Sequence, residues 1–373
     1  MKKIGILTMY YGSNNYGGLL QSYCLCKYLN DLGYDAEQIC FKTNQMFEDD
    51  AISNQSPSLL RKVKRFLMRS VSKKIAARKD KIKTFREDCI PHSEVLYTEN
   101  NLSECNNNYD AFVTGSDQVW NMNWYEHAYF LDFVNEEKSK ISYAASIGME
   151  ELSDEQKATI NDKLKDFKAI SVRERRAVEL IKECTNNPVV QVLDPTLLFE
   201  KEDWDELSSE RIVNSKYLFC YFLGKREDTR KLAKEYARKH SLKIVTIQYV
   251  SGCFRKCDAF FGDIKLYEVD PRDFVSLIKY ADCVITDSFH AGVLSNIYDK
   301  NFFVFQRYAS GKMSSRITSL LELFGNSDRF CDVKEKESLE YIEGVNSMMH
   351  SSDRKTIEQE QKTAYNFLEN ALR

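Results

Sequence analysis

The chain has 373 residues and a formal net charge of −3, with 43% hydrophobic and 29% charged residues. This length predicts two domains, because a single core seldom grows so large. The charge is unlike that of a general nucleic-acid binder, so we expect no nucleic acid as a partner.

The eleven cysteines follow neither a disulfide nor a zinc pattern. Most stand singly in apolar segments, and the pair Cys253 and Cys257 has no second Cys or His pair at zinc spacing. The apolar run after Lys3 is too short for a signal peptide or a membrane span. We therefore expect reduced thiols, a cytoplasmic location and no metal at this cysteine pair.

Strands and helices are predicted to alternate along the first half of the chain. An apolar strand over 3–10 leads into a polar loop, a helix over 19–32 and a strand over 36–41, with Gly33 at the helix C-cap. The later elements are strands over 109–115, 140–147, 169–173 and 189–193 and helices over 153–166 and up to about 183. This alternation is typical of a Rossmann-like parallel sheet, and we place the first domain at 1–195.

Residues 59–86 form a basic insert in this domain. Twelve lysines and arginines stand against one acid, Asp80, and apolar residues recur at helical spacing. The pattern predicts a basic amphipathic helix or helix pair. Two roles stay open for it: a solvated helix at the domain edge, or a helix that rests on an anionic membrane.

The second half repeats the alternation. Strands are predicted over 217–223, 243–248, 282–286 and 302–305, and helices over 226–240, 270–280 and 291–298. We assign 196–352 to a second Rossmann-like domain and 353–373 to a C-terminal helix that can pack back on the first. Two such domains facing a cleft would bind ligands beyond the carboxyl ends of their strands.

Two polar loops follow strands of the first domain. In the first, the backbone N–H groups of Gly17 and Gly18 open a helix and could hold an anion or a sugar hydroxyl; the alternative is a tight turn that needs glycine for packing. In the second, Asp117 could accept from a hydroxyl, while Trp120 and Trp124 could stack on a sugar. The alternative is an Asx-type turn with Trp120 in the core.

Two further strand ends carry cationic chemistry. Arg173 leaves a strand, and its guanidinium suits a carboxylate or phosphate, although a salt bridge to Glu174 is the more ordinary reading. His290 follows the apolar strand that ends at Thr286 and lies near a helix start, where free N–H groups favour an anion. A structural histidine is the alternative.

With these loops, the sequence resembles the polysaccharide pyruvyl transferase family. The segments that carry the resemblance occur in family order and cover roughly residues 4–330: Asn15–Gln21, Gly115–Asn121, Ser171–Glu174, Asp194–Leu198, Ile285–His290 and Ser315–Ile317. Many members have glycine directly after the histidine, where this chain has Ala291 and then Gly292.

The resemblance implies a GT-B-like fold, phosphoenolpyruvate as donor and a sugar diol as acceptor, yielding a pyruvate ketal in capsular, exo- or cell-wall polysaccharide without a metal. Such acceptors are often lipid-linked, which would bring the protein to the inner face of the membrane through 59–86. It leaves the acceptor and the oligomeric state open. His290 is our candidate general acid/base, because imidazole titrates near neutrality.

The remaining site residues are assigned by role. Asp117 is the second catalytic candidate. The donor-binding candidates are Arg173, Gln248, Ser288, Phe289, Gly292 and Arg316. The acceptor-binding candidates are Asn15, Tyr16, Gly17, Gly18, Gln21, Ser116, Gln118 and Trp120.

The main alternative is a glycosyltransferase of the same fold with a nucleotide-sugar donor. It would need a nucleotide pocket in the second domain and an acidic ribose contact after a glycine turn, and the sequence shows no clear one. A sugar-binding protein without activity is a weaker alternative.

Overall fold

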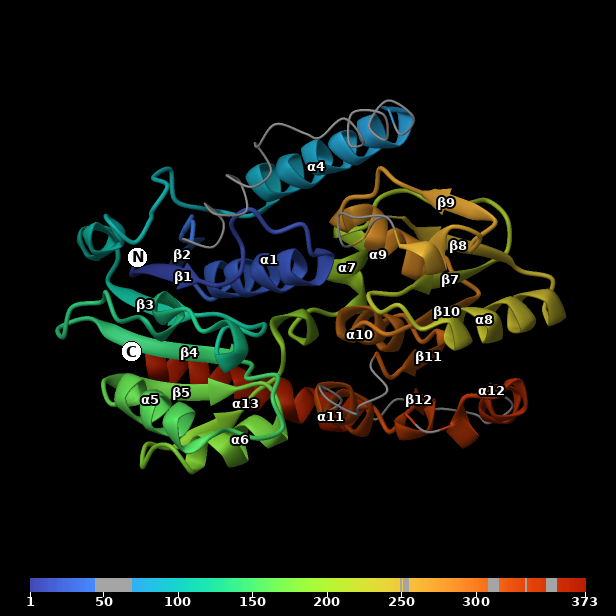
Figure 1. Ribbon diagram of the computed structural model, residues 1–373. Helices are drawn as coiled ribbons and strands as arrows, with labels where there is room; N and C mark the ends of the chain where they lie inside the picture. The colour runs from blue at the N-terminus through green and yellow to red at the C-terminus, as the bar shows by residue number, and fades with distance from the viewer. Residues whose placement is uncertain (44–68, 249, 251–254, 308–314, 333, 347–353) are drawn as a thin grey trace. The chain divides into compact units, whose positions relative to one another are not determined.

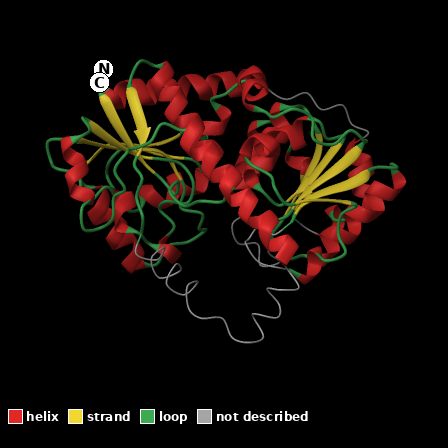
Figure 2. Cartoon of the chain, turned by 90° about the horizontal axis from the view of Figure 1, so that it is seen from above, coloured by secondary structure: helices red, strands yellow, loops and turns green. Residues whose placement is uncertain are grey.

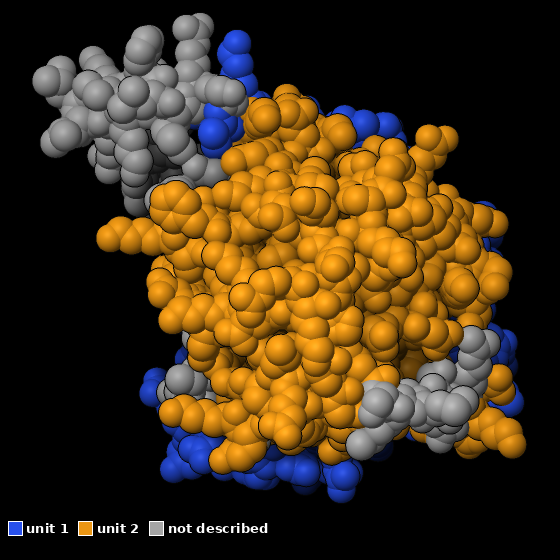
Figure 3. Space-filling model, turned by 90° about the vertical axis from the view of Figure 1, so that its right-hand side faces the viewer, with its two compact units in different colours: residues 1–73, 83–198, 360–373 blue, residues 74–82, 199–359 orange. Residues whose placement is uncertain are grey.

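The computed structural model describes residues 1–43, 69–248, 250, 255–307, 315–332, 334–346 and 354–373. The chain divides into two compact units, coloured separately in Figure 3. Unit 1 comprises 1–73, 83–198 and 360–373, and unit 2 comprises 74–82 and 199–359. In each unit, helices flank a parallel sheet (Figures 1 and 2).

Unit 1 is built on six parallel strands in the order β2-β1-β3-β4-β5-β6. The strands are β1 (Lys3–Leu7), β2 (Asp35–Gln38), β3 (Ala111–Thr114), β4 (Ser139–Ala145), β5 (Phe167–Val172) and β6 (Val189–Gln191). The helices are α1 (Tyr16–Asp31), α5 (Asp154–Leu164), α6 (Arg175–Lys182) and most of α13 (Arg354–Leu372), with short 3-10 turns at 102–107, 122–124, 127–130 and 195–197. β3 is wholly buried, as expected of a central parallel strand.

The two chain termini lie together in unit 1 (Figure 2). Lys2 Nζ donates to the carbonyl of Leu372 at 2.7 Å, and the side chain of Gln361 donates to the carbonyl of Leu197. Leu368 and Leu372 of α13 are buried. The C-terminal helix is therefore a structural part of unit 1.

Unit 2 repeats the design with the order β12-β11-β10-β7-β8-β9. Its strands are β7 (Tyr217–Tyr221), β8 (Lys243–Ile247), β9 (Ile264–Leu266), β10 (Cys283–Thr286), β11 (Asn301–Phe305) and β12 (Phe330–Cys331). Its helices are α7 (Lys201–Leu207), α8 (Glu227–Lys239), α9 (Pro271–Lys279), α10 (Phe289–Ile297), α11 (Ser315–Leu323) and α12 (Leu339–Asn346), with 3-10 turns at 256–258, 327–329 and 334–336. The cap expected at α9 is present: Asp270 accepts from the N–H groups of Arg272 and Asp273, and Pro271 follows it.

Each sheet has one point where consecutive strands depart in opposite directions. In unit 1 this lies between β1 and β3, and in unit 2 between β7 and β10. Such switch points open a crevice beyond the carboxyl ends of the two strands, where α/β proteins bind ligands. The loops to inspect therefore follow these four strands.

The basic insert is described only from α4 (Arg69–Cys89) onward, and the predicted helix over 59–68 lies outside the described residues. Three basic residues of α4 are engaged within unit 2. Arg78 is buried and donates to the carbonyl of Gln248, Lys74 lies over the Tyr267 ring, and Lys81 pairs with Asp273. Part of the basic face thus has structural partners. Among the described helices, none is both long and apolar enough to cross a membrane.

Candidate functional site

The switch point of unit 1 is formed by the loops after β1 and β3 and by the start of α1. Asn15 is the N-cap of α1 and accepts from the Gly17 N–H at 3.1 Å. A side chain at Gly18 would lie 3.5 Å from Asp117 Oδ2, so the Asp117 carboxylate lies beside the first turn of this helix. A carboxylate there interacts favourably with the positive end of the helix dipole.

The loop after β3 turns sharply at Asp117, which has a positive φ of 70°. Asp117 Oδ1 accepts from the Gln118 N–H, and the Asp117 carbonyl accepts from the N–H groups of Val119 and Ser146. Thr8 Oγ1 donates to the carbonyl of Ser116 at 2.8 Å, which ties the ends of β1 and β3 together. The Asp117 side chain thus bonds the next N–H of the chain, whereas an Asx turn, the alternative considered for this loop, bonds the second one. An Asx turn of this kind occurs at Asn121, whose side chain accepts from the Asn123 N–H at 3.0 Å.

Three acceptor candidates face the interior of unit 1. Trp120 is fully buried, stacks on Phe130 with ring centroids 5.4 Å apart, and donates its indole N–H to the carbonyl of Tyr129. Its predicted sugar-stacking role is wrong, because no face of the ring is exposed. Gln21 and Ser116 are also fully buried, so they can shape the loop but have no exposed atoms to offer a sugar.

The other acceptor candidates have different degrees of exposure. Asn15 is exposed, Gln118 is half-buried, and Tyr16, Gly17 and Gly18 are buried in the first turn of α1. Trp124 is 42% exposed, and its Nε1 donates to the Gln118 carbonyl at 3.4 Å. Of the two tryptophans considered from the sequence, only Trp124 can present a ring face to a sugar.

Arg173 lies in a buried ionic cluster at the end of β5. Its Nη1 donates to Asp194 Oδ2 at 2.7 Å, and its Nε donates to Glu174 Oε1 at 3.0 Å. Burial by itself would lower the pKa of Arg173, but the carboxylates of Glu174 and Asp194 outweigh it and hold that pKa above its ordinary value. The salt-bridge alternative is thus present, and direct donor binding by Arg173 stays a prediction.

The switch point of unit 2 is organised by Asp287. Its two carboxylate oxygens accept from the N–H groups of Leu223 and Gly224, each at 2.7 Å. Arg307, just beyond β11, donates to the Asp287 carbonyl at 3.0 Å. Asp287 therefore joins the loops after β7 and β10, and both of its oxygens are already used as acceptors.

Two buried arginines hold the other side of the loop after β7. Arg255 donates to the carbonyls of Phe222 and Leu223, and Arg230 donates to that of Gly224. Both guanidinium groups also pair with Asp258. Arg230, Arg255 and Arg307 were not predicted as site residues from the sequence. Only Arg307 had a local indication in the sequence, since it stands just past an apolar strand.

His290 lies in the first turn of α10, because this helix begins at Phe289, two residues before the predicted start at 291. Ser288 is the N-cap, and its hydroxyl accepts from the Ala291 N–H at 3.5 Å. His290 is 7% exposed, and its ring meets that of Phe289 edge to face with centroids 5.1 Å apart. The imidazole and the first N–H groups of α10 thus share one strand end, beyond β10.

The remaining donor candidates are spread over unit 2. Gly292 packs closely, since a Cβ there would lie 3.4 Å from Leu320 of α11 and from Val304 of β11. Arg316 is buried in the first turn of α11. Gln248 is buried at the end of β8, where its carbonyl accepts from Arg78. The structure therefore groups Ser288, Phe289 and His290 on one turn.

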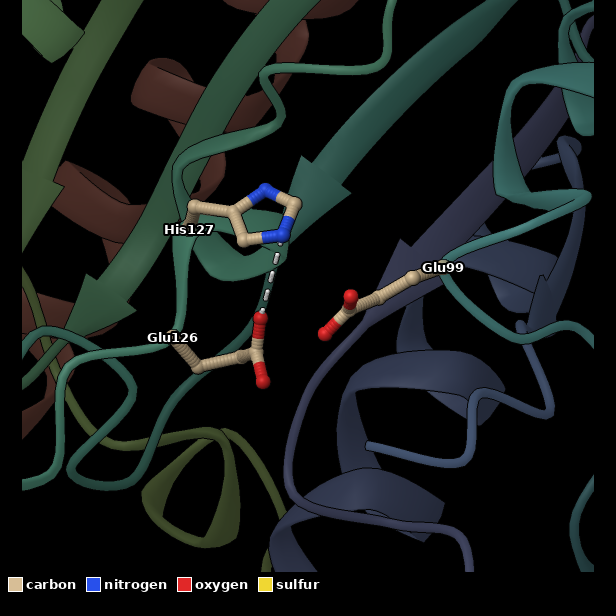
Figure 4. A group of neighbouring side chains, drawn as sticks. All are labelled: Glu99, Glu126 and His127. Carbon is tan, nitrogen blue, oxygen red and sulfur yellow. Dashed lines mark ion pairs between the residues drawn. The ribbon is translucent and has the colours of Figure 1, made fainter. Parts of the chain in front are cut away.

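A separate cluster in unit 1 could attract a cation. Ligand atoms of Glu99, Glu126 and His127 all lie within 4.8 Å of one another (Figure 4). The cluster already has protein partners: His127 Nε2 lies 3.6 Å from Glu126 Oε1, and His127 Nδ1 lies 3.9 Å from Asp132, which pairs with Lys163. His127 therefore already faces two carboxylates, those of Glu126 and Asp132.

Comparison with solved structures identifies the fold. UDP-GlcNAc 2-epimerase from Methanocaldococcus jannaschii is similar over 98% of this chain and 100% of that chain, with a TM-score of 0.55 and 12% identity. A UDP co-structure of S. aureus MnaA is similar over 97% of this chain and 91% of that chain, with a TM-score of 0.50 and 12% identity. At such low identity the likeness concerns the fold alone, which is GT-B-like.

Sequence comparison narrows the assignment. No curated protein matches the sequence significantly. The polysaccharide pyruvyl transferase family matches residues 15–307, a span that begins at the N-cap of α1 and ends at Arg307. The matched span includes the start of α1, the loops after β3, β7 and β10, and His290. The chain therefore belongs to the polysaccharide pyruvyl transferase family.

Proposed function

We propose that the protein transfers the enolpyruvyl group of phosphoenolpyruvate to a sugar diol, forming a cyclic pyruvate ketal in capsular, exo- or cell-wall polysaccharide. The observation that carries this proposal is the position of His290 in the first turn of α10, at the switch point of unit 2. An ionisable imidazole there shares the strand end with backbone N–H groups suited to a phosphate or carboxylate.

The reaction needs a fixed set of proton transfers. One acceptor hydroxyl loses its proton as its oxygen bonds to C2 of phosphoenolpyruvate, while the CH2 carbon gains a proton. The C2–O bond to phosphate then breaks, the second hydroxyl bonds to C2, and its proton leaves with phosphate or solvent. We assign the proton delivered to carbon to His290, since imidazole exchanges protons near neutral pH.

Cationic groups near α10 would hold the donor. Arg307 lies beyond β11 beside the Asp287 carbonyl, and its side chain is 22% exposed. We add it to Ser288, Phe289, Gly292, Arg316 and Gln248 as a donor-binding residue. Because arginines and helix N–H groups can neutralise the donor's charges, we propose that transfer needs no metal or other cofactor. Activity that survives exhaustive chelation would support this point.

The acceptor is assigned to unit 1. Asp117 can accept a hydrogen bond from a sugar hydroxyl or take its proton, and the exposed indole of Trp124 can stack on a sugar ring. Asn15, Gly17, Gly18 and Gln118 would complete the acceptor-binding residues of unit 1.

A ligand-stabilisation experiment tests the proposal. Thermal unfolding is measured with phosphoenolpyruvate and, separately, with UDP, CMP or GDP; binding to the folded state raises stability by about 2.7 kcal/mol at a ligand concentration 100 times Kd. We expect stabilisation by phosphoenolpyruvate alone and its loss in Arg307→Met. A matched control is Arg272→Met, which removes an arginine that pairs with Asp270 at the start of α9.

The alternative function is glycosyl transfer from a nucleotide sugar. Its support is the fold shared with UDP-GlcNAc 2-epimerase, which acts on a nucleotide sugar. Stabilisation by a nucleotide but not by phosphoenolpyruvate would favour this alternative and remove the role given to His290.

The membrane contact through 59–86 stays a prediction that accompanies the proposal, with a lipid-linked acceptor and a peripheral position on the inner face of the membrane. Within described α4, Lys73 and Lys79 are exposed, while Lys74, Arg78 and Lys81 have partners in unit 2. Substitution of the exposed lysines, with vesicle sedimentation as readout, tests it.

A further inference from the structure

Two adjacent phenylalanines of unit 2 have opposite surroundings. Phe261 is buried, and its ring lies 5.9 Å from that of Phe222 in the core of unit 2. Phe260 is 91% exposed, and among the described large hydrophobic side chains only that of Met1, at 93%, is more exposed. Exposure of an aromatic ring to water is unfavourable, so a partner that covers the Phe260 ring would gain binding free energy from it.

The turn that presents Phe260 is anchored at both ends. The Phe261 N–H donates to the carbonyl of Asp258, and Lys265 Nζ donates to the carbonyl of Ala259 at 2.7 Å. Gly262 has a φ of +96°, and a Cβ there would lie 2.5 Å from the methyl carbon of Thr246, so only glycine fits. These two hydrogen bonds and the conformation of Gly262 therefore fix the turn that presents Phe260.

Beside Phe260 lies a hollow of about 450 Å³ with a basic wall. Lys234 and Arg238 of α8 and Lys243 of β8 line it, and all three are exposed. In the described part of the chain, none of the three forms an ion pair. Lys239, the neighbour of Arg238, does pair, with Glu343 at 3.6 Å.

One acid lines the same hollow. Asp263 is exposed, and its Oδ2 accepts from the Ile244 N–H at 2.8 Å, which fixes the carboxylate against the sheet. Arg238 also complements the dipole at the end of α8, but Lys234 lies a full turn earlier and Lys243 beyond the helix. The dipole at the end of α8 therefore accounts for Arg238 but not for Lys234 or Lys243.

This surface is separate from the candidate site of unit 2. Lys243 is the first residue of β8, at the amino ends of the parallel strands, whereas Ser288 and His290 follow the carboxyl end of β10. It also differs from the 59–86 segment, since no residue of α4 lines the hollow.

From the exposed phenylalanine and the unpaired cations, we infer that this face of unit 2, defined by Phe260, Lys234, Arg238 and Lys243, docks on an anionic membrane surface. Phe260 enters the interface between headgroups and acyl chains, and the three cations face lipid phosphates. Anionic lipid supplies both components that the surface lacks, apolar cover and negative charge. The inference does not depend on pyruvyl transfer.

Vesicle co-sedimentation of the full chain tests it, with phosphatidylcholine vesicles and vesicles that also contain phosphatidylglycerol. We expect binding only to the anionic vesicles at low salt, and its loss at high salt. Phe260→Ser should weaken binding by about tenfold, and each of Lys234→Gln, Arg238→Gln and Lys243→Gln by about fivefold. All four side chains are exposed, so the variants should unfold at the wild-type temperature.

Two matched controls separate this surface from other basic residues. Lys239→Gln, on the same helix but paired with Glu343, should bind vesicles as the wild type does. Lys73→Gln with Lys79→Gln tests the insert. Wild-type protein that fails to bind anionic vesicles at low salt overturns the inference, as does binding that is unchanged by Phe260→Ser and the hollow's charge variants. Stabilisation by inorganic phosphate without vesicle binding would show a free-anion site instead, and would also overturn it.

Discussion

Arg173 Nη1 lies 2.7 Å from Asp194 Oδ2, and the side chains of both residues are buried. The pair is joined by Ser116, whose hydroxyl donates to the same Asp194 oxygen at 2.9 Å. Ser116 immediately precedes Asp117, so the ion pair fixes the loop that carries the candidate catalytic carboxylate. The arginine at the end of β5 thus has a structural partner 21 residues away in the chain.

The first prediction concerns this pair. Asp194→Ala should lower the free energy of unfolding by about 3–5 kcal/mol, because it leaves a buried guanidinium without one of its carboxylates. The matched control is Glu179→Ala: Arg176 and Glu179 are also 2.7 Å apart, but both are substantially exposed, so we expect a loss of about 0–1 kcal/mol. Urea unfolding measures both. Equal losses in the two variants would show that burial does not set the strength of these pairs.

The alternation of strands and helices was predictable because apolar runs mark buried parallel strands. The strands β9 and β12 were missed for a physical reason: they have three and two residues, too few to show a period, and β9 is a half-buried edge strand. The start of α10 was placed two residues late, because the capping role of Ser288 depends on the backbone conformation of that turn.

The candidate site was predictable in its strand ends but less so in its side chains. Which tryptophan faces solvent depends on Phe130 and Phe167, whose rings close over Trp120 in the fold. The loop-joining role of Asp287 depends on Gly224, 63 residues earlier. Such distant contacts leave no local pattern in the sequence.

The second prediction concerns the close approach of these loops. In Gly224→Ala, the new Cβ would lie 2.8 Å from Asp287 Oδ2 and 2.9 Å from Arg307 Cγ, so the loop must shift. We expect a loss of about 1–3 kcal/mol in stability, together with lower turnover. Gly344→Ala is the control, since nothing lies within 4 Å of the new Cβ in helix α12; it should add up to about 1 kcal/mol. If Gly224→Ala leaves the stability unchanged, the loop has room for the added methyl group.

The third prediction concerns pH and the cluster of Figure 4. Burial raises the pKa of the Glu126 carboxyl above its ordinary value of 4.5, and the Glu99 carboxylate adds to the rise, against the opposing effects of the Ala128 N–H and His127. The unfolded chain then ionises at lower pH than the folded protein. The stability that this group contributes is therefore full below pH 4.5 and is lost as pH rises through the folded pKa.

Glu126→Gln removes that titration. Relative to wild type, the variant should gain stability as pH rises from about 4 to 7, because only the wild type carries a partly buried charge at the higher pH. Glu99→Gln should give a smaller change of the same sign, since it removes one source of repulsion. Urea midpoints across this range measure both effects. A difference between Glu126→Gln and wild type that stays constant with pH would contradict the assignment.

The fourth prediction concerns His290 and separates chemistry from binding. His290→Ala should lower turnover by about 10²-fold or more, the usual contribution of a general acid or base. Stabilisation by phosphoenolpyruvate should largely persist, because the N–H groups of α10 and the neighbouring Arg307 remain. The control is His240→Ala: His240 is exposed, pairs with Glu343 at the end of α8, and should leave turnover unchanged. If His290→Ala instead keeps its turnover and loses phosphoenolpyruvate binding, the imidazole binds the donor and the proton to carbon must come from another group. If His290→Ala keeps both its turnover and its binding of phosphoenolpyruvate, His290 has neither role.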